Sequence, residues 1–156
     1  MEEPRELMTT TSLSLNLIAP DLVRLLEQVG DARRRRVVSV VCDLAVGYSG
    51  LLDARAERAL AALAAGRFGE APERREMRSL IEELDTVTWV VQEQIRLGKA
   101  TQEDFQRALA KVRAAAAISY AFEPDSLQAA SEALFEAHHS IQDLELLRTA
   151  IANALR

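Results

Sequence analysis

The sequence predicts an all-α fold, a bundle of six or seven antiparallel helices. Along most of the chain, apolar residues recur at steps of three and four, which is the spacing of the buried face of a helix. The four prolines and most of the six glycines fall between these periodic segments rather than within them. The connections are short, so we expect helices that follow each other in the sequence to pack antiparallel.

Residues 1–16 are predicted to form a flexible or extended arm, and residues 17–156 a single helical domain. Leu13, Leu15 and Leu17 alternate with polar residues, which is the period of an extended segment. No second strand is predicted for this segment to pair with. We therefore expect an arm that lies on the domain, with a true strand as the alternative. The total of 156 residues fits one domain of ordinary size.

The first helix is expected over residues 20–29, because proline suits the first helical position and a glycine follows. The second is expected over residues 31–48. Between residues 37 and 46 it has only two polar residues, so it should be the central and most buried helix. A third helix, over residues 53–65, starts at an aspartate that suits a helix cap, and the Phe68 that follows it should fold back onto the core.

The fourth helix is the longest, over residues 72–97, and a glycine ends it. A Thr-x-x-Asp pattern that resembles a capping box opens a fifth helix over residues 101–122. A sixth is expected over residues 126–139 and a seventh over residues 143–155, and whether these two form one kinked helix stays open. The predicted inner face of the fourth helix consists of Met77, Leu80, Ile81, Leu84, Val87, Val91 and Ile95.

The composition favours a cytoplasmic protein from a bacterium with a GC-rich genome. Arginine outnumbers lysine by 17 to 2, which reflects codon usage rather than chemistry. The single cysteine, Cys42, has no internal partner, in agreement with a reducing compartment. We see neither a stretch of about 20 apolar residues that would span a membrane nor a signal peptide. The net charge of −5 disfavours general binding to nucleic acid.

Four consecutive arginines, Arg33, Arg34, Arg35 and Arg36, open the second helix. Positive charge at this end opposes the helix dipole, at a cost of a few tenths of a kcal/mol per residue. Four consecutive residues also span more than one turn, so their side chains point in different directions. They form either a binding patch for an acidic partner or a phosphate, or a solvated collar in which one or two arginines pair with Asp43 or a carboxylate of the fourth helix.

Asp43 and Cys42 lie inside the most apolar helix. A buried carboxylate needs a charged or hydrogen-bonding partner, so Asp43 is expected to form a structural ion pair with an arginine. The alternative is a catalytic or ligand-binding acid. Cys42 is expected to be a small core residue, because no neighbouring sequence feature would activate its thiol.

A Glu-x-x-His pattern, Glu136 and His139, has the spacing of one of the two such motifs in ferritin-like metal sites, which also need two further glutamates. Glu132 lies one turn earlier and would add a ligand. The chain has no second Glu-x-x-His, so no metal or other cofactor is favoured. The alternative is one histidine on the apolar face of the helix and one in solvent.

Trp89 lies off the apolar stripe of the fourth helix. It is either a core residue on a second face or an exposed interface residue of the kind that dominates binding energy. Burial of this face against a second copy of the chain would give a homodimer, which we favour over a monomer. The acidic flank of the same helix consists of Glu82, Glu83, Asp85 and Glu93.

Residues 33–66 resemble a group of all-helical bacterial toxin-immunity proteins. The matching features are the basic lead, Cys42 with Ala45, Asp53 with Arg55, Ala59 with Leu60, an alanine run and Gly66. The resemblance implies a helical protein that binds and neutralises a toxin.

No glycine-rich phosphate loop, Ser/His/Asp pattern or paired-cysteine spacing occurs in the sequence, and we assign no catalytic residue. The sequence therefore predicts a non-enzymatic interaction module, most concretely an immunity or regulatory protein that binds a partner protein through residues 33–36 and Trp89. One alternative is a helical ligand- or metal-binding bundle that uses Glu132, Glu136 and His139. A second is a nucleic-acid-associated regulator that uses the arginines.

Overall fold

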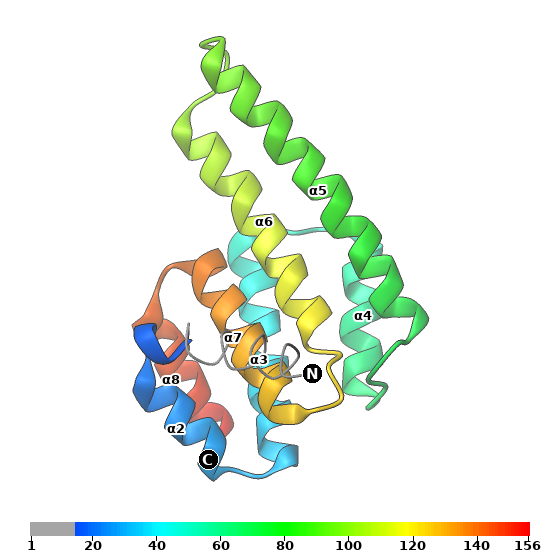
Figure 1. Ribbon diagram of the computed structural model, residues 1–156, viewed down its shortest axis with the longest axis vertical. Helices are drawn as coiled ribbons and strands as arrows, with labels where there is room; N and C mark the ends of the chain where they lie inside the picture. Colours follow the sequence, from blue (N-terminus) through cyan, green and yellow to red (C-terminus); the bar gives the residue numbers. More distant parts are fainter. Residues whose placement is uncertain (1–14) are drawn as a thin grey trace, which may run out of the picture.

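The structure, a computed structural model, describes residues 15–156, and this part of the chain contains helices and loops but no strand. The predicted all-α bundle is therefore confirmed (Figure 1). None of the helices in residues 15–156 is both long and apolar enough to cross a membrane. In chain order the helices are α2 (Pro20–Gln28), α3 (Asp31–Ser49), α4 (Ala54–Ala64), α5 (Pro72–Arg96), α6 (Gln102–Tyr120), α7 (Ser126–Ile141) and α8 (Leu144–Ala154).

The predicted N-terminal arm falls mostly on residues 1–14, which lie outside the described residues. Residues 15–18 form a helical turn, so the expected extended conformation is wrong for Leu15 and Leu17. Leu15 is fully buried and Leu17 is 87% exposed. Leu15 begins a stripe with steps of four, three and four residues, and this helical period outweighs the local alternation. The stripe consists of Leu15, Ala19, Leu22 and Leu26, all buried.

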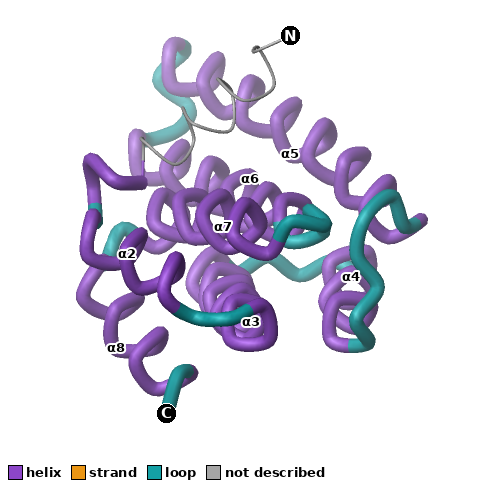
Figure 2. The backbone as a smooth tube through the Cα atoms, turned by 60° about the horizontal axis from the view of Figure 1, so that its bottom comes forward, coloured by secondary structure: helices purple, strands orange, loops and turns teal. Residues whose placement is uncertain are grey.

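α3 lies at the centre of the bundle and contacts α4, α6, α7 and α8, in agreement with its predicted position. The helix that is buried over most of its length is α7, however, and not α3. α7 packs against α2, α3, α6 and α8 (Figure 2). Most of its buried residues are alanine or serine, and such short side chains leave room for neighbouring helices on several sides.

The starts of α4 and α6 follow the predicted capping pattern, whereas α3 begins at Asp31, which was expected to cap it, and has no side-chain cap. Asp53 caps α4, where its Oδ1 accepts a hydrogen bond of 2.8 Å from the backbone N–H of Arg55. Thr101 and Asp104 form a complete capping box at the start of α6. The break before Asp143, which caps α8, leaves α7 and α8 as two helices.

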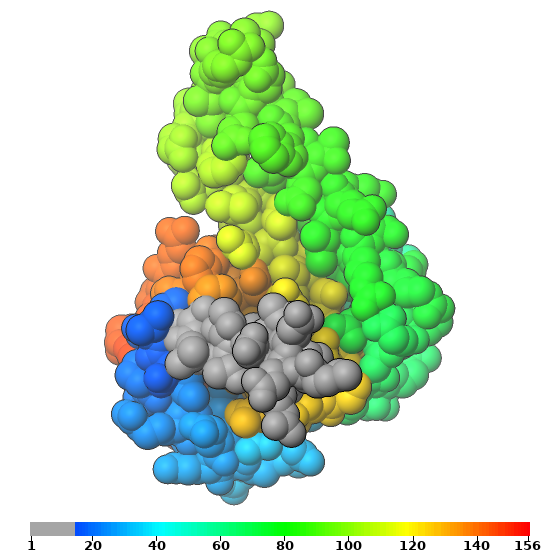
Figure 3. Space-filling view, viewed as in Figure 1, coloured from blue at the N-terminus to red at the C-terminus, as the bar shows by residue number. Residues whose placement is uncertain are grey.

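α5 and α6 form a hairpin whose far half extends beyond the rest of the bundle (Figures 1 and 3). We call residues 85–109 the projecting hairpin. Among the residues that the structure describes, no apolar side chain of the projecting hairpin belongs to the core cluster or packs against it. On α5, contact with the core ends at Leu84, and on α6 the core begins again at Ala114. The projecting hairpin is therefore stabilised mainly by the contacts between its own two helices.

Candidate functional site

Arg34 binds the C-terminal end of α2. Its Nε donates to the carbonyl oxygen of Leu26 at 2.7 Å, and its Nη2 donates to that of Glu27 at 3.2 Å. Carbonyl groups in the last turn of a helix have no partner within the helix. Arg34 supplies donors for two of them, and it also contacts Ser126 Oγ at the start of α7, at 3.4 Å.

Arg35 binds the loop that follows α6. Its Nη1 donates to the carbonyl oxygen of Ala121 at 3.0 Å, and its Nη2 donates to those of Glu123 and Pro124, both at 2.8 Å. The guanidinium also lies over the ring of Phe68, 3.7 Å from the ring centre. Phe68 thus folds back onto the bundle, as predicted, although its side chain stays partly exposed.

Arg36 donates from Nη1 to the carbonyl oxygen of Ala154 in the last turn of α8, at 3.2 Å. Three successive arginines therefore contact the C-terminal ends of three different helices, α2, α6 and α8. All three helices run antiparallel to α3, so their C-terminal ends lie near its N-terminus (Figure 1). Positive charge is favourable at these ends, which offsets its unfavourable position on α3.

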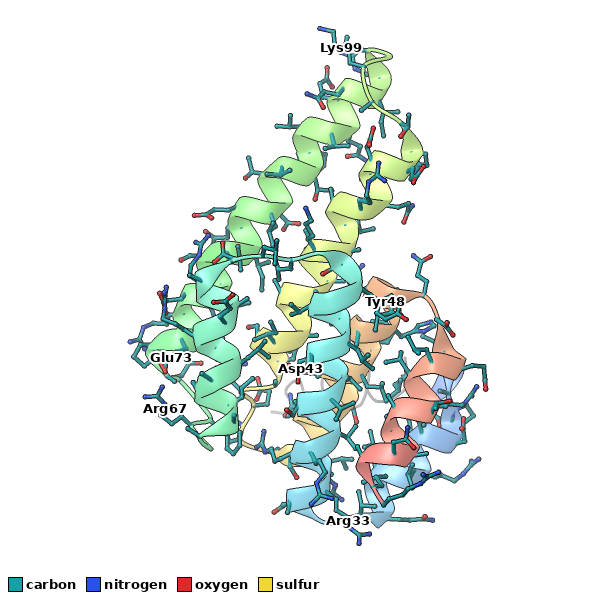
Figure 4. The ribbon with its side chains drawn as sticks, turned by 180° about the vertical axis from the view of Figure 1, so that it is seen from behind. Arg33, Asp43, Tyr48, Arg67, Glu73 and Lys99 are labelled. Carbon is teal, nitrogen blue, oxygen red and sulfur yellow. The ribbon has the colours of Figure 1, made fainter. Side chains whose placement is uncertain are left out.

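The arginine cluster is thus mainly structural, but not in the way predicted. The expected ion pairs with Asp43 or a carboxylate of α5 are wrong, because most acceptors are backbone carbonyl groups and the ion pair that Arg34 forms is with Asp31 of its own helix. Arg33 points away from the bundle at the end opposite to the projecting hairpin (Figure 4). Its side chain has no hydrogen bond or ion pair within residues 15–156. Of the four predicted partner-binding arginines, Arg33 is the one whose side chain makes no hydrogen bond to the described part of the chain.

Asp43 is exposed, so its predicted burial is wrong (Figure 4). It has no ion pair in the part of the chain that the structure describes, and partial desolvation raises the pKa of its carboxyl. Val37, Val41 and Ala45 form the buried side of α3. Asp43 lies two positions from Val41 and from Ala45, so its side chain points away from that side. Cys42 is fully buried, as expected, and burial raises the pKa of its thiol.

The two predicted metal-ligand carboxylates, Glu132 and Glu136, are buried on α7. The Glu136 Oε2 lies 3.1 Å from Nη1 of Arg113 on α6, and Glu132 Oε1 lies 3.5 Å from the Nε2 of Gln128. His139 places Nδ1 2.9 Å from the carbonyl oxygen of Phe135. Within residues 15–156, no three His, Cys, Asp or Glu residues gather in a way that would hold a metal ion. These residues share a helix face but do not form a ligand set.

Trp89 lies on the projecting hairpin and is 71% exposed. The prediction that Trp89 is a core residue on a second face is therefore wrong. The structure shows the alternative, an exposed side chain. Val87, which the sequence places on the inner face of α5, is also exposed, and Thr88 is buried in its place. The sequence pattern did not mark Val90 and Leu97, which are exposed as well. The exposed fractions of Val87, Val90 and Leu97 are 52%, 51% and 53%.

The acidic flank of α5 divides into paired and unpaired carboxylates. Glu83 forms an ion pair with Arg55 of α4, and Glu93 pairs with Arg96 one turn later. The side chains of Glu82 and Asp85 are exposed and have no ion pair or side-chain hydrogen bond within residues 15–156. The two unpaired carboxylates lie four and seven residues before Trp89, whereas Glu93, four residues after it, is paired.

Comparisons with protein-family models, with curated proteins and with solved structures found no match. The resemblance of residues 33–66 to toxin-immunity proteins stays a prediction. Any proposal about function therefore rests on the geometry of the chain itself, and above all on the projecting hairpin.

Proposed function

We propose that this chain is a non-enzymatic, cytoplasmic interaction module, and that its partner protein docks on the projecting hairpin with Trp89 as the central contact. The observation that carries the proposal is the exposure of Trp89, the only tryptophan in the sequence. Tryptophan is enriched among the residues that dominate binding energy at interfaces. An indole left 71% exposed gains free energy when a partner removes it from water.

The surroundings of Trp89 support the same proposal. Three further apolar side chains of the projecting hairpin, Val87, Val90 and Leu97, remain about half exposed. The outer face of a helix in an isolated domain is ordinarily polar. Within residues 15–156 these side chains and Trp89 stay at least half exposed, because α5 and α6 extend beyond the rest of the bundle (Figure 3). A partner protein could therefore contact these side chains without any rearrangement of the core.

The arginine cluster contributes less to this proposal than the sequence suggested. Arg34 and Arg35 use their guanidinium groups to hold the ends of other helices, and only Arg33 is without such contacts in residues 15–156. Binding of an acidic partner, a phosphate or nucleic acid through the whole cluster would break these bonds. We therefore place the partner on the projecting hairpin.

The most concrete form of the proposal is an immunity or regulatory protein, whose partner is encoded by a neighbouring gene. Photo-crosslinking amino acids at position 89 and, in a separate variant, at position 17 would test it with candidate partners co-expressed. Leu17 is the matched control, because it is 87% exposed on the body of the bundle. We expect a crosslink from position 89 and none from position 17. Crosslinks from position 17 alone would overturn the proposed surface.

From the sequence we favour a homodimer over a monomer, and the partner would then be a second copy of the chain. Light scattering at high protein concentration measures the mass directly. A dimer that Trp89→Ala converts to a monomer would identify the second copy as the partner, and a monomeric mass for the unmodified chain would remove the homodimer.

A further inference from the structure

α5 carries six carboxylates, and their pairing is uneven. Four of them form ion pairs, and the four pairs are Glu73 with Arg67, Glu76 with Arg58, Glu83 with Arg55, and Glu93 with Arg96. The other two, Glu82 and Asp85, have no charged partner within residues 15–156. Both precede Trp89, by seven and four residues, so all three side chains lie on one face of the helix within two turns.

No lysine or arginine within residues 15–156 forms an ion pair with either of these two carboxylates. The nearest arginines on the same helix face, Arg78 and Arg96, are each engaged with another carboxylate, Glu70 and Glu93 respectively. The exposed indole therefore has two carboxylates on its own helix face that are without an ion pair in residues 15–156. Such a surface repels anionic partners and attracts cationic ones, and the attraction weakens as salt increases.

We propose that Glu82, Asp85 and Trp89 form a recognition patch for a basic, amphipathic segment of a partner protein. Lysine or arginine side chains of the segment would bind the two carboxylates, and its apolar side would cover the indole. A guanidinium or ammonium group above the indole ring would add a cation–π contact. This inference rests on the proposed function, a partner docked on the projecting hairpin, and it assigns the chemistry of that partner.

The single tryptophan makes the patch directly observable, because all indole fluorescence of the protein comes from Trp89. The probe is a synthetic amphipathic helical peptide of lysine and leucine, compared with its glutamate–leucine counterpart. We expect the lysine peptide to shift the emission to shorter wavelength, and the glutamate peptide to leave it unchanged. The shift should decline between about 20 mM and about 500 mM NaCl, as the Debye length shortens.

A pair of double variants separates the patch from the net charge. Glu82→Gln with Asp85→Asn removes the two unpaired carboxylates, and we expect it to weaken binding of the lysine peptide about tenfold or more, which corresponds to about 1.4 kcal/mol or more. Glu27→Gln with Glu57→Gln changes the net charge by the same amount at exposed sites elsewhere on the bundle. This control should bind as the unmodified chain does. Circular dichroism confirms that both variants fold.

Equal emission shifts with the two peptides, or equally weakened binding of the lysine peptide in both double variants, would overturn the inference. An emission shift on adding anionic phospholipid vesicles or single-stranded DNA in place of the lysine peptide would also overturn it. None of them bears on the proposed function, which the crosslinks from position 89 decide. A partner that crosslinks at position 89 and binds the Glu82/Asp85 variant undiminished would leave the docking surface in place and remove only its basic chemistry.

Discussion

The guanidinium of Arg35 lies 3.7 Å from the centre of the Phe68 ring, and this contact joins the start of α3 to the turn between α4 and α5. The same guanidinium holds three carbonyl groups after α6. The turn is further fixed by a hydrogen bond of 2.6 Å from the backbone N–H of Gly69 to the carbonyl oxygen of Phe122. One side chain thus connects three segments that are far apart in the sequence.

Removal of the Arg35 side chain should therefore destabilise the fold. We expect Arg35→Ala to lower the free energy of unfolding by about 2–4 kcal/mol, because charge-assisted hydrogen bonds and a cation–π contact are lost together. Arg35→Lys should recover little, since an ammonium group lacks the planar set of donors. Arg33→Ala is the matched control and should change stability by no more than about 0.5 kcal/mol. Urea titration followed by circular dichroism measures both, and equal losses would contradict the assigned roles.

The ion pair of Asp53 with Arg55 gives stability a dependence on acid pH. The Arg55 side chain, with its backbone N–H, holds the pKa of Asp53 below the ordinary value of 3.8. A carboxyl whose pKa is lower in the folded state stabilises the fold fully above its unfolded pKa, and this contribution is lost as pH falls through the folded value. Asp53→Asn should cost about 1 kcal/mol at pH 7, and the difference from the unmodified chain should vanish below the folded pKa.

A double-mutant cycle checks the source of this pH dependence. In an Arg55→Ala background, Asp53→Asn should lose most of its effect at pH 7, because asparagine caps a helix about as well as aspartate. An unchanged cost in that background would show that Arg55 is not the cause of the lowered pKa.

The projecting hairpin should open more readily than the body of the bundle. Its apolar side chains have no contact with the core cluster, and regions with few such contacts open at low free-energy cost. Hydrogen exchange should show protection at least about 100-fold lower for amides near the hairpin tip than for those in the middle of α7. Uniform protection across α5, α6 and α7 would mean that the hairpin opens only with the whole domain.

Local features of the fold were predictable from the sequence, whereas the long-range contacts were not. Caps such as Asp53 and the pair Thr101 and Asp104 act on backbone groups three or fewer residues away, so their spacing is visible in the sequence. The acceptors of Arg35 lie 86 to 89 residues further along the chain. They are backbone carbonyls, which every residue has, so no residue type marks them. The position of that loop depends on how α6 packs against α3.

The exposed part of the candidate site was hidden for a different reason. Periodicity identifies which residues share a face of a helix, but it does not show whether a neighbouring helix reaches that face. Val87 continues the stripe of Leu80 and Leu84, yet it lies beyond the end of the core. For Trp89 the sequence left both interpretations open, and only the length of the hairpin relative to the bundle decides between them.

Leu15 and Leu17 offer the sharpest test of the N-terminal boundary of the domain. In a helical turn, Leu15 enters the core and Leu17 faces solvent, whereas an extended arm on the surface would give the two side chains equivalent positions. We expect Leu15→Ala to lower the free energy of unfolding by about 2–4 kcal/mol, the range for a buried leucine. Leu17→Ala should change it by no more than about 0.5 kcal/mol. Small and equal effects in urea titrations would place both residues outside the core, and the domain would then begin at α2.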